Sequence, residues 1–340
     1  LLFFILTCFF QIANAQTSVQ EYIEGRNKRL VPEKTMLEPL SKETIISLYK
    51  RLYLTSEIDT IVWNGNINRC NPGNLSAKIY IKAENRINFF RLVNGLNEVQ
   101  NNPELNKDAQ NAALLVKANN QLTHYPKKSM KCYTKSAANG CQKSLLGFTN
   151  WIHFPKTAFI TQFIRDFGAT NYFVGHRRWL LYSRLSEFGY GATNTSEAVL
   201  TVSPNNRAVR ASSDYINPPK FVAYPWNGYV PVNLIYPYWS FSIPKDNEVD
   251  FSKAKISMVD AAGKQIDINV EKERNLLDHT IVWTATGLFS KDEIRYGKNN
   301  LQSKGYLNKR ITVIINGVFV NGQNKEYEYF VEPILINQTL

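Results

Sequence analysis

The spacing of apolar residues changes sharply near residue 204, and this change sets the fold class. Before it, residues 83–96 and 106–122 place apolar side chains at helical spacing. After it, short segments such as WSFSIP, HTIVWTA and YEYFVEPIL are rich in β-branched and aromatic residues and are separated by turn residues. The sequence therefore predicts an α+β protein that ends in an all-β, immunoglobulin-like sandwich.

The N-terminal segment predicts export. Residues 1–15, LLFFILTCFFQIANA, are apolar and end in Ala13-Asn14-Ala15, the small-x-small pattern at which signal peptides are cleaved. The run is short for a membrane span, and the polar segment QTSVQEYIEGRNKR follows it. We therefore expect a signal peptide at residues 1–15, a secreted or cell-surface protein, and no transmembrane anchor.

The basic composition favours anionic partners other than nucleic acid. The formal net charge is +12, yet the 40 Lys and Arg are scattered, with only short pairs such as 127–128 and 177–178. Arms that bind nucleic acid carry longer basic runs, so we expect no nucleic-acid partner. A generally basic surface instead attracts anionic membranes or cell-wall polymers.

Composition and pattern also predict the domain boundaries. Residues 16–77 form a polar lead-in with one helix, SKETIISLYKRLYL, for which Ser41 is the expected N-cap. Residues 78–203 hold the main helices and, at 187–202, a strand or hairpin. Residues 204–225 are rich in Pro, Asn and Ser, so they predict a linker to the β region at 226–340.

Three cysteines follow the predicted signal peptide: Cys70, Cys132 and Cys141. In an oxidising compartment, three cysteines predict one disulfide and one free thiol, with Cys132 paired to either Cys70 or Cys141. No CxxC spacing accompanies them, which argues against a cysteine-ligated metal.

Four motifs occur in a specific order within residues 80–203. The first helix contains NRINFFRLVNGL, the second is followed by LTHYP, and VGHRRWLLY and EFGYGAT come next. In this order they resemble the CAP superfamily, also called SCP domains, in its bacterial form. The matching positions are Asn88, Arg91, Gly95, Leu96, His124, Gly175, His176, Arg177, Gly189 and Gly191.

The resemblance implies an α–β–α sandwich at residues 78–203, with a cleft that in some members holds two histidines, two acids and a divalent cation. The histidines correspond to His124 and His176, and Asp166 is the best candidate for one acid. Lys143 or Ser144 occupies the place of the other acid. We therefore expect a ligand cleft formed by His124, His176, Asp166, Arg177 and Ser144, with His124 and His176 as candidate metal ligands.

The segment VGHRRWLLY is expected to lead from a cleft loop into a core strand. Its two consecutive arginines would face different ways, so only one of them would line the cleft and frame it. We expect an arginine here either to stack on Trp179 or another aromatic residue or to form a salt bridge with Asp166.

The preferred function is noncatalytic binding of an extracellular lipid, glycan or cell-wall polymer in the cleft, with the β region as a spacer or adhesion unit. One alternative is a hydrolase of peptide or cell-wall material that uses Zn(II) or another divalent cation held by His124, His176 and Asp166. Another is a structural cell-surface protein. The resemblance implies these ligand classes, and no cofactor or catalytic residue is assigned.

Overall fold

The fold is taken from a computed structural model that describes residues 38–337, except 59, 150–158, 169, 209–218, 273 and 275. The predicted signal peptide and residues 16–37 of the lead-in lie outside the described residues, as does the middle of the predicted linker. In the described part, no helix is long and apolar enough to span a membrane.

The lead-in contains the predicted helix. Helix α2 (Lys42–Leu48) begins at Ser41, whose side chain accepts a hydrogen bond from the backbone N–H of Thr44, so the predicted N-cap is confirmed. The helix continues without interruption into the π-helical turn η1 (Tyr49–Tyr53) and the 3-10 turn η2 (Leu54–Ser56).

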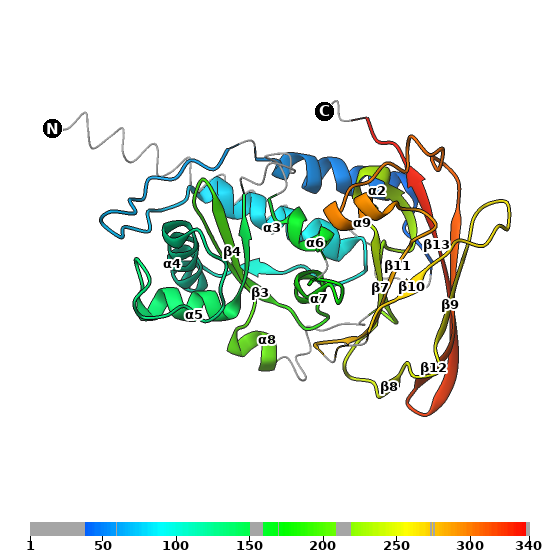
Figure 1. The fold of residues 1–340 in the computed structure, drawn as a ribbon. Helices are drawn as coiled ribbons and strands as arrows, with labels where there is room; N and C mark the ends of the chain where they lie inside the picture. The colour runs from blue at the N-terminus through cyan, green and yellow to red at the C-terminus, as the bar shows by residue number, and fades with distance from the viewer. Residues whose placement is uncertain are drawn as a thin grey trace. The chain divides into compact units, whose positions relative to one another are not determined.

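Residues 77–200 form a layered structure around one sheet (Figure 1). The sheet has the strand order β1-β3-β4-β2, and β3 and β4 form the hairpin that the sequence predicts at 187–202. Helices α4 and α5 cover one face, while α3 and α6 lie toward the other. The elements are α3 (Ala77–Leu92), β1 (Gln100–Asn101), α4 (Pro103–Asn119), α5 (Lys135–Lys143), β2 (Ser144–Phe148), α6 (Thr161–Arg165), β3 (Glu187–Ala192) and β4 (Ser196–Leu200).

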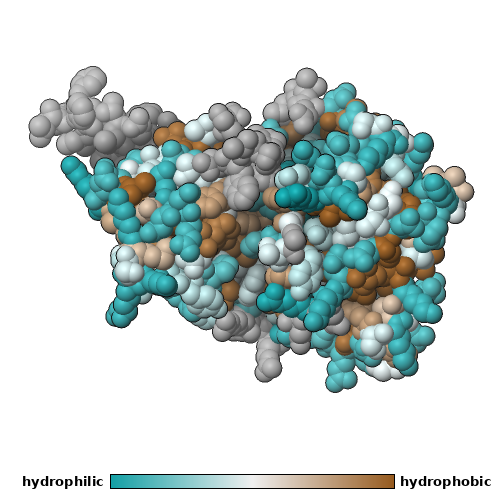
Figure 2. All heavy atoms as spheres, viewed as in Figure 1, coloured by the Kyte–Doolittle hydropathy of each residue, from teal (hydrophilic) through white to brown (hydrophobic). Residues whose placement is uncertain are grey.

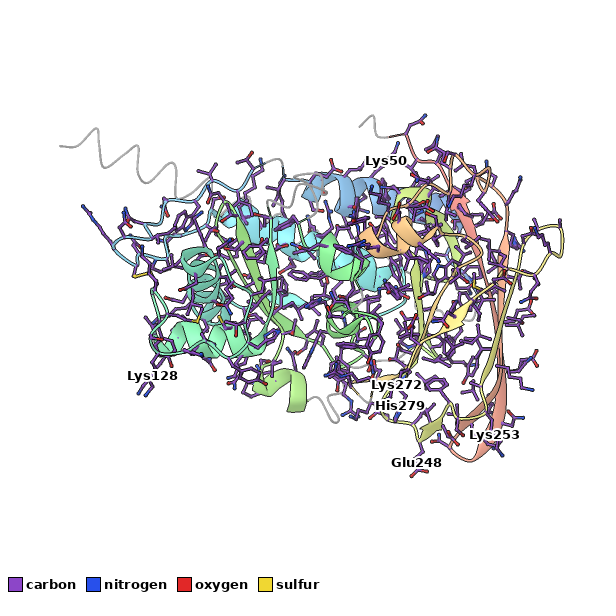
Figure 3. The ribbon with its side chains drawn as sticks, in the orientation of Figure 1. Lys50, Lys128, Glu248, Lys253, Lys272 and His279 are labelled. Carbon is purple, nitrogen blue, oxygen red and sulfur yellow. A yellow bond between two sulfur atoms is a disulfide. The ribbon has the colours of Figure 1, made fainter. Side chains whose placement is uncertain are left out.

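The outer faces of α4 and α5 are polar, as expected for amphipathic helices on a sheet. Hydrophilic residues cover much of the surface around α5 in Figure 2. Lys128, in the connector between α4 and α5, points into solvent (Figure 3).

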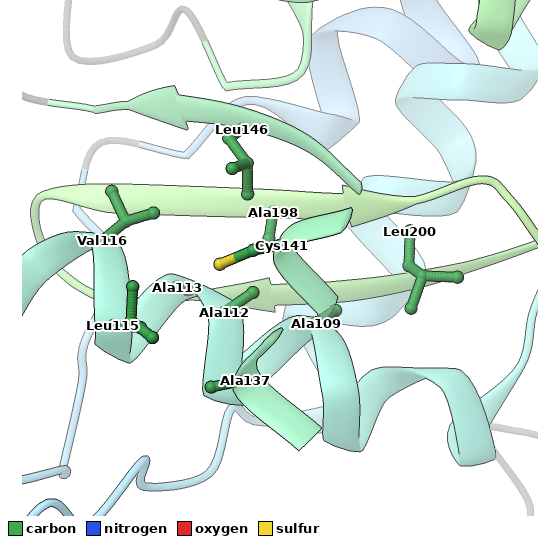
Figure 4. Close-up of a cluster of buried hydrophobic side chains, with 10 residues drawn as sticks. All are labelled: Ala109, Ala112, Ala113, Leu115, Val116, Ala137, Cys141, Leu146, Ala198 and Leu200. Atoms are coloured by element: carbon green, nitrogen blue, oxygen red, sulfur yellow. The ribbon is translucent and has the colours of Figure 1, made fainter. Parts of the chain in front are cut away.

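The face between α4 and the sheet is packed with small residues (Figure 4). Ala109, Ala112 and Ala113 of α4 are fully buried against Ala198 of β4. A Cβ atom at Gly191 of β3 would overlap the backbone of α4 at residues 109–110. The helix therefore contacts the strand backbone directly, and the glycine of the EFGYGAT motif is needed because it has no side chain.

The opposite face of the sheet holds a buried carboxyl group. Glu197 of β4 is fully buried and accepts hydrogen bonds from the Tyr190 hydroxyl (2.9 Å), the Gln162 side-chain amide and the backbone N–H of Ile160 (3.3 Å). Burial raises the pKa of Glu197 to about 7, although the hydrogen bonds from Gln162 and Tyr190 lower it.

Residues 222–334 form two further sheets, with strand orders β10-β11-β7-β5 and β6-β13-β12-β8, and β9 also pairs with β12. Their faces meet where the ring of Phe241 contacts Tyr327 (4.9 Å between centroids) and the Trp283 indole N–H donates to Met258 sulfur (3.1 Å). The strands are β5 (Val222–Tyr224), β6 (Gly228–Pro231), β7 (Tyr238–Ile243), β8 (Val249–Asp250), β9 (Lys255–Val259), β10 (Asn269–Val270), β11 (His279–Thr284), β12 (Ile311–Val320) and β13 (Gln323–Ile334). The facing sheets agree with the predicted strand-rich region, and the immunoglobulin-like topology stays a prediction.

Short helical elements accompany these strands. They are α8 (Pro204–Ala208), η3 (Val232–Leu234) and α9 (Lys291–Tyr296). Because α8 and β5 occupy the two ends of the predicted linker, the structure assigns regular elements to part of that segment.

The VGHRRWLLY segment differs from its prediction. It forms a short helix, α7 (Gly175–Leu180), where a strand was expected, and both arginines are buried. Arg177 donates to the carbonyls of Ile164 (2.7 Å) and Tyr238 (2.8 Å), and Arg178 donates to those of Arg274 (2.9 Å) and Asp278 (3.0 Å). Both side chains point into the interior of the protein. Their hydrogen bonds therefore hold α7 against the strand-rich region.

The motif residues of α3 are structural in the same way. Arg91, which is fully buried, donates to the carbonyls of Asn97, Leu180, Tyr182 and Leu185 at 2.7–3.0 Å. A guanidinium satisfies several carbonyls at once because its donors are fixed in a planar fork.

The disulfide joins Cys70 to Cys132, which settles the two pairings left open by the sequence. It connects the loop after residue 63 to the connector between α4 and α5. Cys141 is buried with a free thiol, and burial raises its pKa to about 12, so the thiol stays protonated and unreactive.

We expect replacement of Arg177 by Ala to lower the free energy of unfolding by about 3–5 kcal/mol, because buried carbonyls on both sides lose their donors. Urea unfolding followed by tryptophan fluorescence measures this change. Arg310, which is half-exposed and 3.7 Å from Glu332, is the matched control, and Arg310→Ala should cost less than about 1 kcal/mol. Equal losses for the two variants would contradict the structural role of Arg177.

Glu197 predicts a pH dependence of stability. Its pKa in the folded protein, about 7, is above the ordinary value of 4.5, so the folded state holds the proton more tightly than the unfolded chain does. The stabilisation is complete below pH 4.5 and is lost as the pH rises through 7, by about 3 kcal/mol. Urea unfolding at pH 5 and pH 8 should show a smaller difference for Glu197→Gln than for wild type. Glu326→Gln, on an exposed part of β13, should retain the wild-type difference, and a Glu197→Gln variant that did the same would refute this assignment.

Candidate ligand-binding site

His176 lies at the start of α7, and Asp166 fixes its orientation. One oxygen of Asp166 accepts a hydrogen bond from Nδ1 of His176 (2.8 Å). The other accepts from the backbone N–H groups of His176 (2.8 Å) and Arg177 (3.2 Å). The Asp166 side chain is fully buried. It therefore caps the first turn of α7 and leaves Nε2 as the ring nitrogen of His176 that is available for other contacts.

The same pair determines the charge of the histidine. Burial lowers the pKa of His176, whereas the negative charge of Asp166 and its hydrogen bond raise it, and the net result is a pKa above the ordinary value. The cationic form of His176 is thus favoured by its neighbour.

The backbone that leads to His176 is strained. Val174, just before α7, is fully buried and has a φ of 45° in the left-handed region, where β-branched residues are rare. Asp166, at the end of α6, also has a φ of 45°. Such conformations persist where the surrounding structure enforces them, and they concentrate at functional sites.

His124 comes from the connector after α4. Its Nδ1 lies 2.8 Å from the carbonyl oxygen of Cys141, which holds the ring against the end of α5. His124 and His176 line the same two cavities, so the structure brings the two predicted histidines to one site.

The side chains available as metal ligands do not fit the predicted metal ion. A zinc site needs at least three protein ligands, and in the described part of the chain no three His, Cys, Asp or Glu side chains are placed to share an ion. Asp166, the expected third ligand, uses both oxygens to hold α7 and His176.

Two cavities adjoin the histidines. Cavity A has a volume of about 350 Å³ and lies over the ends of α5 and α7, with Lys143, Ser144, Trp179 and Thr201 among its lining residues. Cavity B has a volume of about 470 Å³ and extends past Gln162 and Asp166. Asn171 and both histidines line the two cavities, whose volumes are typical of small-molecule sites.

Two buried hydroxyl groups of residues that line cavity A have no hydrogen-bond partner among the described residues. They belong to Ser144 and Thr201, which are 3% and 0% exposed. The residues are neighbours, because Ser144 of β2 pairs with Leu200 of β4 and the backbone N–H of Thr201 donates to the carbonyl of Lys143 (3.1 Å). Buried hydroxyls are normally satisfied, so this pair is suited to a bound molecule.

The strand-rich region also contributes to cavity A. Leu276, in the segment between β10 and β11, lines it, and the carbonyl of Leu276 accepts a hydrogen bond from Arg178. The guanidinium of Arg274 stacks over Phe173, another lining residue, at 4.2 Å from its centroid. Residues of both the layered region and the strand-rich region thus line the cavity.

The predicted cleft residues therefore have different roles. His124, His176 and Ser144 line cavity A, and Asp166 lines cavity B while it supports His176. Arg177 lies behind them, 1% exposed, and lines neither cavity. The sequence did not indicate Thr201, whose contribution follows from its place beside Ser144 in the sheet.

Part of the chain matches a known protein family. Residues 84–203 match the model of the CAP family, described as the cysteine-rich secretory protein family. A comparison with curated proteins gave no match. The matched residues include both histidines and the sheet that carries Ser144 and Thr201. The match supports a protein of the CAP superfamily, with residues 84–203 as its CAP domain.

Proposed function

We propose that this protein is a secreted, bacterial-type CAP protein that binds an extracellular glycan in cavity A without catalysis. The observation that carries the proposal is the pair of unpartnered buried hydroxyls of Ser144 and Thr201, at the wall of a cavity large enough for a small ligand. A ligand with hydroxyl or carboxyl groups supplies the hydrogen bonds that these side chains lack.

The lining of cavity A favours a glycan over a lipid. Asn171, Gln142 and the two histidines offer amide and imidazole groups, while Phe173 and Trp179 offer aromatic surfaces. A sugar ring presents hydroxyls at its edge and C–H groups on its faces, which matches such a mixed lining. An acyl chain needs a continuous apolar lining, and the many polar groups here would lose water without gaining partners.

A noncatalytic role agrees with the geometry. A serine nucleophile requires a hydrogen bond to its general base, but the Ser144 hydroxyl has no partner in the described structure, so His176 does not activate it. The cation-dependent hydrolase lacks a third ligand among the described residues. The His176–Asp166 pair then serves to hold an imidazole donor in the cavity.

Secretion is supported by the Ala-x-Ala end of the first 15 residues and by the disulfide between Cys70 and Cys132, which is typical of exported proteins. The proposal assigns the strand-rich, immunoglobulin-like region a direct part in the site through Leu276, where a spacer or adhesion unit was predicted.

Removing the hydroxyls of Ser144 and Thr201 tests the proposed glycan binding. Ser144→Ala and Thr201→Val retain the shape of the side chains but remove the unpartnered hydroxyls. Without ligand, we expect stability to be unchanged or raised by up to about 1 kcal/mol, because no hydrogen bond is lost on folding. Glycan affinity should fall about tenfold for either variant, since each loses a hydrogen bond to the ligand. Calorimetry with the chain from residue 16 onward measures binding, and urea unfolding measures stability.

The matched control is Ser196→Ala. Ser196 lies in β4, and its hydroxyl is also buried, but it donates a hydrogen bond to the carbonyl of Ala113 (2.8 Å). This variant should lose about 1 kcal/mol of stability and keep its affinity. If the protein bound phosphatidylcholine vesicles but no saccharide, the ligand would be a lipid and the glycan proposal would be wrong. Failure to bind chitotetraose, acidic oligosaccharides or vesicles would favour the structural surface protein.

A further inference from the structure

No carboxylate is among the lining residues of cavity A. Its lining residues include Lys143, His124 and His176 but no Asp or Glu. The carboxylate of Asp166, which bonds to His176, lines cavity B and accepts three hydrogen bonds from α7. Lys143 is thus a cationic lining group without a carboxylate beside it in the lining, whereas His176 already has Asp166 as its counter-ion.

Lys143 is the cationic side chain of cavity A that is most directly available to an anionic ligand. It is half-buried at the end of α5, and its amino group makes no ion pair with any carboxylate in the described part of the chain. Its backbone is fixed, because its carbonyl accepts hydrogen bonds from the N–H groups of Thr201 (3.1 Å) and Val202 (3.2 Å). The amino group and the two unpartnered hydroxyls therefore belong to adjacent, ordered positions.

The surface that leads to the cavity is basic as well. Residues 109–165 contain seven lysines and one arginine but no Asp or Glu. The connector that starts at His124 and Tyr125, both lining cavity A, carries exposed lysines at 127, 128 and 131, and Lys135 follows at the start of α5. Lys128 projects into solvent beside α5 (Figure 3). These exposed lysines raise the local concentration of anions, although the Asp108 carboxylate also contacts α5 at Ser136 and Asn139.

Tyr125 adds an aromatic surface at this basic edge. It is 79% exposed, which is unusual for a large apolar ring, and it lies two residues before Lys127. An exposed aromatic residue next to cationic side chains can contact a sugar ring while the lysines neutralise its acidic group.

We propose that the ligand of cavity A is an acidic saccharide, whose carboxylate is bound by Lys143 with the hydroxyls of Ser144 and Thr201. This inference rests on the proposed glycan-binding function and specifies its ligand class. Trp179 and Phe173 provide the apolar surface for the sugar ring, and His176 donates a hydrogen bond from Nε2 when it is protonated. The raised pKa of His176 is consistent with an anionic ligand.

A structural role for Lys143 predicts something different. Lys143 lies in the last turn of α5, where a cation stabilises the helix dipole by about 0.3–1 kcal/mol. Removal of the charge would then change stability slightly and would affect neutral and acidic ligands alike.

The test uses ligand pairs that differ only in charge: tetramers of galacturonic acid and of mannuronic acid, each compared with its methyl ester. Calorimetry at low salt should show that the acids bind at least tenfold more tightly than the esters. Lys143→Gln should reduce this preference to less than about threefold, whereas Lys264→Gln, in an exposed turn of the strand-rich region, should leave it unchanged. Added salt should weaken the binding of the acids only.

The results test recognition of the carboxylate and glycan binding separately. If the methyl esters bind as tightly as the acids, or if Lys143→Gln retains the preference, recognition of the carboxylate is overturned while glycan binding stands. If neither member of any pair binds and chitotetraose also fails, the glycan-binding function itself fails. Binding to phosphatidylglycerol vesicles in preference to both acids would assign the basic surface to anionic lipid and overturn the inference.

Discussion

Hydrogen bonds from buried arginines to backbone carbonyls hold this fold together. A buried guanidinium costs several kcal/mol unless its donors are satisfied, so each such arginine requires particular carbonyl groups to come close. Arg86 donates to the carbonyl of Tyr53 and to the Ser56 hydroxyl. Arg91 donates to the carbonyls of Asn97 and Leu185, and Arg177 to those of Ile164 and Tyr238. Burial lowers the pKa of Arg177 to about 10, which still leaves it charged at neutral pH. The helices, the sheet and the strand-rich region are therefore connected by cations that contact main-chain oxygens.

Much of the layered fold could be predicted because its signals are local. Helical periodicity marked α3 and α4, and alternation with glycines marked the β3–β4 hairpin. The α7 segment was predicted wrongly as a strand, since the apolar run after the arginines is too short to distinguish a strand from a single helical turn. The roles of Arg177 and Arg178 could not be predicted, because a carbonyl acceptor 60–100 residues away carries no signature in the sequence.

The residues of the candidate site could likewise be predicted only in part. The motifs identified His124 and His176, and closeness in sequence suggested Asp166. The sequence could not show that Asp166 caps α7 and orients the imidazole, because this depends on the left-handed turn at the end of α6. Thr201 was missed for a related reason, since only the strand register places it next to Ser144.

The wall that Leu276 contributes to cavity A bears on how such a protein can evolve. Domains that shuffle between genes normally carry complete sites with them, and a boundary near residue 204 would suggest such a module here. In this chain the segment that ends at Asp278 is held by Arg178 of α7, so recombination at that boundary would open the cavity on one side. A different C-terminal region would therefore leave this side of cavity A without the wall that Leu276 provides.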